Sequence, residues 1–277
     1  MDTKHKLSLS SAPALADLAS YRRLVGQLIN LTITKPYLAY SVHIHIQFIC
    51  TPTEEHLYAA HRVLRYLKSA PAQGLFNPNN WSLHITAFCD AAWASYPITW
   101  RSVTGYYILL STFLVSWKTK KQAVVSRSYV EAEYRVMANA LCELVWLVRV
   151  LKDFHIDVFT PIPFFCDTNA AMHIARNPVF HERTKHVEID CHVVWQYVSH
   201  GLVPRYISTV EQPADLFTKA LPADQLSRLS SKLNVSNILH TLSFRGVLSV
   251  LIQTELQGRS ILGLNSRAAA MAEFGLN

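Results

Sequence analysis

Glycine is scarce in this sequence, which holds 8 glycines among 277 residues. That share is about 3%, against about 7% in average proteins, and it excludes collagen-like chains and glycine-rich linkers. The two glycine-rich phosphate-binding patterns, GxGxxG and GxxxxGK[ST], are both absent. The sequence therefore argues against a Rossmann dinucleotide-binding fold and against a P-loop nucleotidase.

Cysteine pairs are also missing. The five cysteines are scattered and contain no CxxC spacing: Cys50, Cys89, Cys142, Cys166 and Cys191. A disulfide framework or a structural zinc site is therefore not expected. An intracellular, reducing compartment, either cytoplasm or nucleus, suits such cysteines better.

Long apolar runs are absent as well. The richest run, residues 140–151, is interrupted by Glu143 and Arg149, whereas a membrane-spanning helix needs about 18 or more apolar residues. The N-terminus lacks the continuous apolar core of a secretory signal peptide. We therefore expect neither a membrane span nor a secretion signal.

Charge is the first positive indication. Only 16% of the residues are charged, but 26 basic residues outnumber 19 acidic ones, which gives a formal net charge of +7. Half of the residues are apolar, which supplies a folded core and rules out disorder of the whole chain. The excess of positive charge weakly favours a polyanionic partner such as nucleic acid.

The spacing of apolar residues divides the chain into four segments. Residues 1–20 have no clear periodicity and are expected to be disordered, whereas residues 21–75 follow a helical spacing. Turn-forming residues then mark a boundary between this helical segment and the next segment. Residues 82–235 alternate between strand and helix patterns, and residues 236–277 are unassigned and expected to be poorly ordered.

The segment 82–235 predicts the element order β-β-β-α-β-α-α-β-α. The strands are expected over residues 82–89, 103–111, 113–118, 161–167 and 202–208, and the helices over 129–154, 170–176, 184–200 and 213–233. A hairpin followed by alternating helices and strands implies an α/β fold, in which helices cover the faces of a mixed sheet.

Four acidic residues stand at the ends of these elements. Asp90 and Asp167 close the first and fourth strands, Glu133 lies early in the long helix, and Asp215 opens the last helical stretch. Such positions can converge above one edge of an α/β sheet. Each acid taken alone is better explained as a solvated loop residue or a helix cap, and only the four together indicate a site.

Four clustered carboxylates repel one another unless cations lie among them. Two Mg²⁺ ions about 3.5–4 Å apart would neutralise the group and clamp a phosphodiester for hydrolysis. Magnesium suits the site because it prefers hard oxygen ligands, and Mn²⁺ is the alternative. The pattern predicts a metal site formed by Asp90, Glu133, Asp167 and Asp215.

Several longer runs resemble a known family. The runs FCDAAWAS (88–95), RSVTGYYILL (101–110), SWKTKKQAVVSRS (116–128), EAEYRVMA (131–138), FFCDTNAAMHIARNPVFHERTKHVEID (164–190) and PADLFTKAL (213–221) resemble the ribonuclease H domain of copia-type retrotransposon Pol polyproteins. The runs YRRLVGQLINLTITKPYLAY (21–40) and AAHRVLRYLK (59–68) resemble the end of the reverse transcriptase that precedes that domain.

The resemblance implies a ribonuclease H-like fold, a five-stranded mixed sheet flanked by helices, preceded by a helical remnant of the reverse transcriptase thumb or connection. It also implies metal-dependent hydrolysis of the RNA strand in an RNA–DNA hybrid, with the four acids named above as catalytic metal ligands. Glu131 is the alternative to Glu133 for the glutamate position of the site. Residues two apart on a helix face different sides, so only one of the two can point at the metals.

The resemblance also bears on partners. Other parts of the Pol polyprotein are possible partners, and the oligomeric state stays open. The helical segment 21–75 is expected to present apolar faces to a reverse-transcriptase part. No YxDD-type polymerase motif occurs, so DNA synthesis is not expected.

Basic residues near the third strand are the predicted nucleic-acid contacts. They are Lys118, Lys120, Lys121 and Arg127, with Trp117 able to lie against a sugar or base. A second polar cluster contributes Arg183 and Lys185. The alternative is a solubilising loop around a core tryptophan. Cys89 and Cys166 precede two of the acids, and strand alternation predicts that both turn away from the site into the core.

The sequence also departs from the family pattern. Ala92 replaces an aspartate of the usual CDADWAG run, and Tyr129-Val130 replaces a small Ser-Ala pair ahead of the glutamates. None of the four acids is missing. An RNA–DNA hybrid ribonuclease therefore competes with a catalytically silent remnant that only binds nucleic acid, and a non-enzymatic interaction module is the third possibility.

Overall fold

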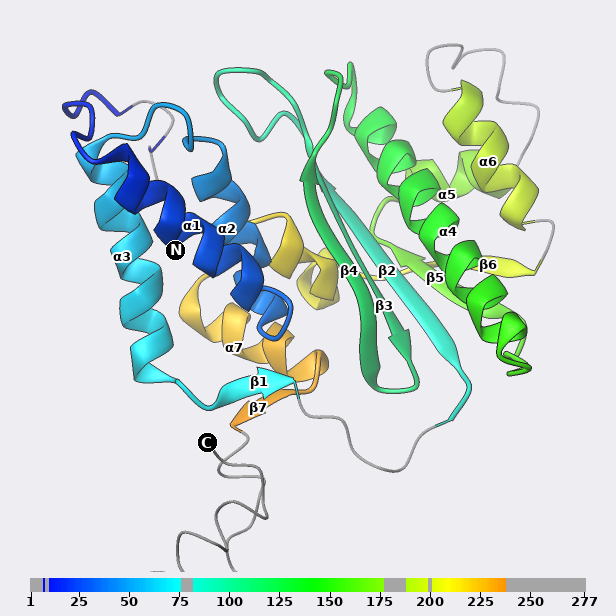
Figure 1. Ribbon diagram of the computed structural model, residues 1–277. Coiled ribbons are helices and arrows are strands. Elements are labelled where there is room, and N and C mark those ends of the chain that lie inside the picture. The colour runs from blue at the N-terminus through cyan, green and yellow to red at the C-terminus, as the bar shows by residue number, and fades with distance from the viewer. Residues whose placement is uncertain (1–6, 8–9, 76–81, 177–187, 199–200, 238–277) are drawn as a thin grey trace, which may run out of the picture. The chain divides into compact units, whose positions relative to one another are not determined.

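The computed structural model describes residues 7, 10–75, 82–176, 188–198 and 201–237 (Figure 1). The predicted nucleic-acid ligands Arg183 and Lys185 lie outside these described residues, as does the chain from residue 238 onward. The chain divides into two compact units, Met1–Ser236 and Asn237–Asn277. The fold described below is that of the first unit.

Seventeen helices and strands follow one another in the described part of the chain. They are α1 (Leu18–Leu31), η2 (Pro36–Leu38), α2 (Ala39–Ile46), α3 (Glu54–Ser69), β1 (Gln73–Leu75), β2 (Ile85–Ala92), β3 (Val103–Leu110), β4 (Phe113–Lys121), α4 (Tyr129–Asp153), β5 (Ile162–Cys166), α5 (Asn169–Arg176), α6 (Glu188–Val198), β6 (Leu202–Tyr206), η5 (Thr209–Glu211), η6 (Pro213–Phe217), α7 (Ala223–Lys232) and β7 (Val235–Asn237).

The central sheet has five strands in the order β4-β3-β2-β5-β6. The hairpin strands β2, β3 and β4 pair antiparallel, whereas β5 and β6 join parallel to β2. Helix α4 supplies the crossover between β4 and β5, because a parallel neighbour needs a long connection. The five-stranded mixed sheet flanked by helices that the sequence predicted is confirmed.

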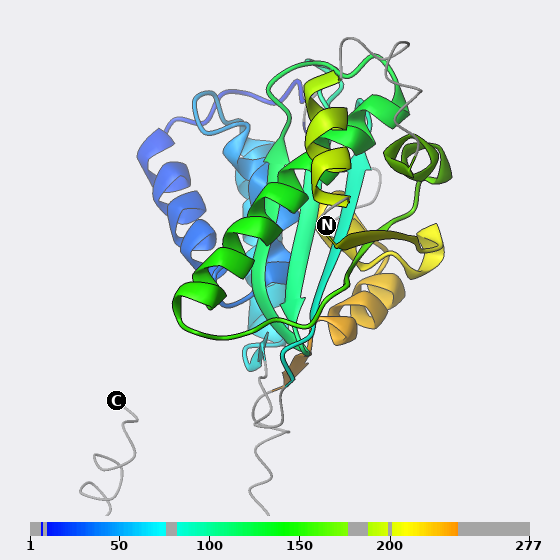
Figure 2. The ribbon, with the colours of Figure 1, turned by 90° about the vertical axis from the view of Figure 1, so that its right-hand side faces the viewer.

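Helices α4, α5 and α6 cover one face of this sheet (Figures 1 and 2). The side chain of Ser128 caps α4 by accepting a hydrogen bond from the Glu131 N–H (3.2 Å). The inner face of α4 buries Met137, Leu141 and Leu144 against alternate residues of β2 and β5. Within the described residues, no helix is long and apolar enough to cross a membrane.

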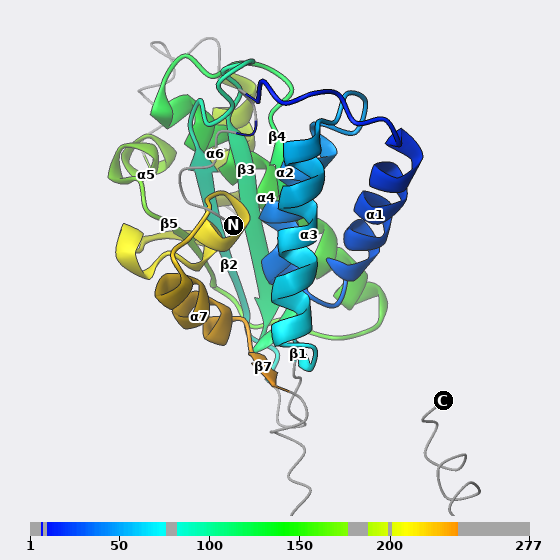
Figure 3. The ribbon, with the colours of Figure 1, turned by 90° about the vertical axis from the view of Figure 1, so that its left-hand side faces the viewer.

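Helices α1, α2, α3 and α7 and the 3₁₀ turn η6 cover the opposite face (Figures 1 and 3). Leu28, Val42 and Val63 from the N-terminal helices pack in one core cluster with Tyr107 of β3 and Phe217 of η6. The sequence predicted that residues 21–75 present apolar faces to a reverse-transcriptase part; in the structure, the apolar side chains named above pack on the sheet. Burial of apolar surface drives this packing of the helices on the sheet.

Two features near the ends of the helical segment were not expected. Helix α1 begins at Leu18, inside the segment predicted to be disordered, and the Asp17 side chain caps it by accepting from the Ser20 N–H (3.0 Å). Strand β1 pairs with β7 in a separate two-stranded sheet. Both strands are three residues long, too short for an alternating pattern to reveal.

The packing of the N-terminal helices on the sheet leads to a first prediction. Ile44 of α2 is buried against Tyr96 and Val103, so Ile44→Val should lower the free energy of unfolding by about 0.5–1.5 kcal/mol. Ile33 is 66% exposed, and Ile33→Val should change it by less than about 0.5 kcal/mol. Urea unfolding followed by tryptophan fluorescence measures both. Separate transitions for helices and sheet would contradict the packing described above.

Candidate functional site

The four predicted acids come from four elements near the carboxyl ends of β2 and β5. Asp90 lies within β2. The sequence predicted that this strand closes at Asp90, but it extends to Ala92. Asp167 directly follows β5, and Glu133 lies in the second turn of α4. Asp215 lies in the 3₁₀ turn η6. Asp90, Glu133 and Asp215 are almost completely buried, whereas Asp167 is partly exposed.

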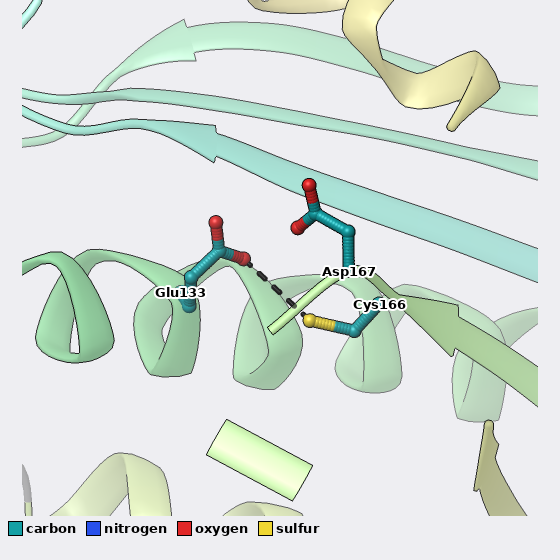
Figure 4. A group of neighbouring side chains, drawn as sticks. All are labelled: Glu133, Cys166 and Asp167. Carbon is teal, nitrogen blue, oxygen red and sulfur yellow. Dashed lines mark hydrogen bonds between the residues drawn. The ribbon is translucent and has the colours of Figure 1, made fainter. Parts of the chain in front are cut away.

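Glu133 and Asp167 form one pair of carboxylates. Figure 4 shows both carboxyl groups in the space between α4 and the end of β5, together with the Cys166 thiol. One potential ligand atom from each of the three side chains lies within 4.8 Å of the other two. The Ala91 N–H donates to Glu133 Oε1 (3.2 Å) and ties this helix residue to the strand position beside Asp90.

Asp90 and Asp215 form the second pair, joined by a lysine. Lys219 Nζ lies 2.6 Å from Asp215 Oδ1 and 3.3 Å from Asp90 Oδ1. The Thr218 hydroxyl donates to the other oxygen of Asp90. Gln212, just ahead of η6, donates from Nε2 to the Cys89 carbonyl (2.9 Å) and ties this turn to β2.

The turn η6 reaches β2 because it packs directly on a glycine. Gly105 of β3 is the register partner of Asp90. A Cβ built on Gly105 would lie 2.9 Å from Phe217 Cβ and 3.2 Å from the Phe217 carbonyl carbon, and closer still to the Thr218 methyl group. Only a residue without a side chain admits this approach.

Three of the four acids have raised pKa values, because burial and neighbouring carboxylates disfavour their charged forms. Burial, together with the charge of Asp90, raises the pKa of Asp215 to about 7, although Lys219 opposes the shift. Burial also raises the pKa of Asp90 and, further, that of Glu133, to which Cys166 and the other acids add. Buried, neighbouring carboxylates resist ionisation in this way until a positive charge joins them.

The donor set is suited to a hard divalent cation. Carboxylate oxygens are the ligands that Mg²⁺ and Mn²⁺ prefer, while the Cys166 thiol is a soft donor that Mg²⁺ does not select. The raised pKa values and the Lys219 ammonium among the acids both indicate that this cluster requires positive charge. The residues present therefore fit the metal that the sequence pattern predicts.

The two rival glutamates point to different partners. The Glu131 carboxylate pairs with Arg135 at 2.6 Å and accepts from the Arg127 N–H at 2.7 Å, which places it at the start of α4. Glu133 is the glutamate beside Asp167. The geometry thus favours Glu133 over Glu131 as the ligand candidate.

Three residues around Asp90 and Asp215 have no counterpart in the sequence predictions. Lys219, Thr218 and Gln212 hold the Asp90 and Asp215 pair. Lys219 lies four residues after Asp215, a spacing at which an acid and a base often pair, and this was the available signal. Thr218 and Gln212 act through contacts distant in sequence, which no local pattern reveals.

The prediction for the cysteines is right in one respect and wrong in another. Cys89 and Cys166 are both fully buried, as expected. Cys166, however, does not turn away from the site, because its Sγ donates to Glu133 Oε2 (3.7 Å). Helix α4 crosses the face of the sheet to which this side chain points, and it brings Glu133 to the thiol.

The predicted basic run is a strand and not a loop, so its residues alternate between the two faces of the sheet. Lys118 Nζ lies 5.8 Å from the centre of the Tyr106 ring, and Lys121 Nζ lies 5.0 Å from that of Tyr96. Lys120 and Arg127 are exposed. Trp117 is half-buried and packs in the core cluster of Tyr107, which favours the core alternative for this side chain.

The sheet order, the helix crossing one face and the acids at the carboxyl ends of its central strands define a ribonuclease H-like domain. Two solved ribonuclease H structures are similar to the chain at low level: the N-terminal RNase H domain of a Mycobacterium tuberculosis protein (13% identity, TM-score 0.36, covering 54% of this chain and 98% of that one) and an RNase H1 isolated from compost (14%, 0.31, covering 58% and 100%). No protein-family model matches the chain.

Curated relatives identify the family. The retrovirus-related Pol polyproteins from Arabidopsis thaliana transposons RE1 and RE2 are 39% and 38% identical over 84% and 86% of this chain. The Pol polyprotein from the Nicotiana tabacum transposon TNT 1-94 is 30% identical over 74% of it. The chain belongs to the family of copia-type retrotransposon Pol polyproteins. It spans about 16% of the length of the two Arabidopsis polyproteins.

Proposed function

We propose that this domain is a metal-dependent endonuclease that hydrolyses the RNA strand of an RNA–DNA hybrid. The observation that carries the proposal is that two carboxylate pairs, Glu133 with Asp167 and Asp90 with Asp215, lie near the carboxyl ends of β2 and β5, where the charges of Asp90 and Asp167 help to raise the pKa of Glu133. The family resemblance supports the same reaction. The proposed cofactor is a pair of Mg²⁺ ions, or Mn²⁺ in their place.

Each carboxylate has a separate task in this proposal. Asp90 and Asp215 would hold one cation between β2 and η6, and Glu133 and Asp167 would hold the other between α4 and β5. When bound, the cations supply Lewis acidity and lower the pKa of water that attacks the phosphodiester. The Ala91 N–H and the Thr218 hydroxyl orient Glu133 and Asp90, so that the ligand oxygens are fixed before substrate arrives.

The edge strand offers a path for the nucleic-acid backbone. Thr119 of β4 pairs with Gly105, which pairs with Asp90, so the basic residues beside Thr119 lie at the level of Asp90 along the sheet. Two strand spacings separate β4 from β2, about 10 Å. Exposed Lys120, with Lys118 and Arg127, is proposed to contact phosphates there, a contribution that weakens as salt concentration rises.

A cleavage assay tests this function. A labelled RNA–DNA hybrid is incubated with the full chain in Mg²⁺, in Mn²⁺ and in a chelator, with duplex RNA and duplex DNA of the same sequence as controls. The expected result is metal-dependent cutting of the RNA strand of the hybrid alone. An absence of cutting, or equal cutting in the chelator, would overturn the proposal.

One observation favours the second candidate, a silent remnant that only binds nucleic acid. Tyr129, where the family pattern has a small residue, lies against the Glu133 and Asp167 pair. Its hydroxyl donates to Asp167 Oδ1 (3.4 Å) and accepts from the Thr168 hydroxyl (3.2 Å). A ring in this position narrows the approach to the carboxylates.

The variant Tyr129→Ser distinguishes the active nuclease from the silent remnant. Removing the ring should open the Glu133 and Asp167 pair and raise the hybrid-cleavage rate about 3- to 10-fold, which corresponds to about 0.7–1.4 kcal/mol in the barrier. Phe154→Ser is the control for loss of an exposed ring, since Phe154 is 71% exposed and directly follows α4, twenty-one residues after Glu133. Equal rates for Tyr129→Ser and wild type would show that the ring does not restrict the site.

A further inference from the structure

The Lys219 ammonium is a cation already located in the proposed metal site. It contacts one oxygen of Asp215 at 2.6 Å and one of Asp90 at 3.3 Å. Both carboxylates are almost fully buried, with exposed fractions of 0% for Asp90 and 3% for Asp215. Buried carboxylates need a partner of opposite charge, and Lys219 supplies it.

We propose that Lys219 is a built-in competitor of the divalent cation at the Asp90 and Asp215 pair. Its ammonium neutralises the two acids when no divalent cation is bound, and it leaves them when one binds. This inference rests on the proposed function, to which it adds a positioning residue that the four acids alone do not predict.

The two cations exclude each other because they use the same oxygens. Mg²⁺ binds carboxylate oxygens at about 2.0–2.1 Å, so an ion shared by Asp90 and Asp215 would stand where the ammonium now lies. Two positive charges so close repel strongly, and protein surroundings screen this repulsion less than water does. Occupancy by the lysine therefore lowers the apparent affinity for the metal.

The lysine is also placed to leave. Lys219 is 35% exposed, in contrast to the acids that it contacts, and its four-carbon stem is flexible. It lines a cavity of about 780 Å³ that is also lined by Tyr58 and Arg62 of α3 and Leu226 of α7. Glu55, whose charge is opposite to that of the ammonium, also lines this cavity.

The test measures metal binding without substrate. Isothermal titration with MgCl₂ and electron paramagnetic resonance with Mn²⁺ compare the full-length wild type with Lys219→Met, which keeps an unbranched side chain one atom shorter and removes its charge. The dissociation constant should fall at least fivefold in Lys219→Met. The thermal midpoint in a chelator should fall as well, because the acids lose their counter-ion, and saturating Mg²⁺ should restore it.

Two further variants make the comparison sharp. Lys232→Met is the matched control, because Lys232 is 34% exposed and pairs with Glu211 outside the acid cluster; its metal affinity should equal that of wild type. Lys219→Arg keeps the positive charge and should bind Mg²⁺ no tighter than wild type. A Lys219→Met chain that folds only in the presence of Mg²⁺ would support the proposal.

The possible failures are distinguishable. Mg²⁺ binding by Lys219→Met that equals or is weaker than that of wild type would overturn the inference alone, and Lys219 would then be a residue that holds Asp215 in place for the metal. An absence of divalent-cation binding in both wild type and Lys219→Met would overturn the proposed metal site, and this inference with it.

Discussion

Asp90→Asn should lower the rate of RNA–DNA hybrid cleavage at saturating Mg²⁺ by at least 100-fold. Asp90 is fully buried on β2 and shares Lys219 with Asp215, so its side chain is enclosed by the site. An amide offers the cation a neutral oxygen in place of a carboxylate. Loss of even a few kcal/mol of charge stabilisation corresponds to about 10²–10³ in rate.

The fold of Asp90→Asn should survive, which separates a chemical effect from unfolding. The wild-type carboxyl has a raised pKa because burial disfavours its charge, and neighbouring Asp167 adds to this effect. A neutral amide relieves both effects, so the thermal midpoint in a chelator should not fall. The rise of that midpoint on addition of Mg²⁺ should shrink, because the bound metal stabilises the native state by mass action.

A matched control exists on α4. Asp153 is an exposed acid at the end of α4, twenty residues after Glu133, which places it about 30 Å from the site. Asp153→Asn makes the same chemical change and should leave cleavage and metal response at wild-type levels. Cleavage by Asp90→Asn at the wild-type rate would overturn the catalytic assignment of Asp90.

The sheet was predictable because its pattern is local. Three signals each lie within a short window of sequence: the alternation over β2 and β3, the hairpin between β3 and β4, and the periodicity of α4. The four acids were singled out because each was expected at the end of an element, where the topology of an α/β sheet brings side chains together. Only Asp167 directly follows its strand, since Asp90 lies within β2 and Glu133 in the second turn of α4. Their role as metal ligands stays a prediction.

The residues that complete the site could not be predicted because their contacts are distant in sequence. Thr218 and Asp90 are 128 residues apart, and Gln212 reaches the Cys89 carbonyl across 123 residues. The position of Cys166 shows the same limit. Strand alternation gives the face of the sheet to which the thiol points, but the crossing of α4 decides whether that face holds the core or Glu133.

The N-terminal helices illustrate a different limit. An amphipathic pattern indicates that Leu28 and Val63 are buried, but it does not identify the surface that covers them. The resemblance suggested a reverse-transcriptase part, and the structure has these residues packed with Tyr107 of the sheet. These helices therefore pack on the same face of the sheet as η6. The turn η6 contains Asp215 and is followed by Lys219, and it lies against β2 and β3.

Gly105→Ala should be the substitution outside the acids with the largest effect. The added methyl group would lie 2.9 Å from Phe217 Cβ and 3.2 Å from its carbonyl carbon. Overpacking of this kind costs about 1–3 kcal/mol of unfolding free energy. Because backbone lies close, the turn η6 must shift away from β3 to relieve the contact.

That shift should affect chemistry as well as stability. Asp215 lies in η6 and Thr218 and Lys219 follow it. Thr218 and Lys219 contact Asp90, the register partner of Gly105, and Lys219 also contacts Asp215. A displacement of about 1 Å at a catalytic group can cost about 100-fold in rate. We therefore expect hybrid cleavage to fall about 10- to 100-fold in Gly105→Ala, with weaker Mg²⁺ binding measured by titration.

Gly26→Ala provides the comparison that isolates the close contact. Gly26 lies in the middle of α1, and a Cβ there would meet nothing within 4 Å. Alanine in a helix interior is favoured over glycine, so this variant should gain about 0.5–1 kcal/mol and cleave at the wild-type rate. If both glycine variants matched wild type in cleavage and unfolding midpoint, η6 would not depend on Gly105. If only Gly105→Ala loses activity, the scarce glycine at this position is what lets the turn bring Asp215 to Asp90.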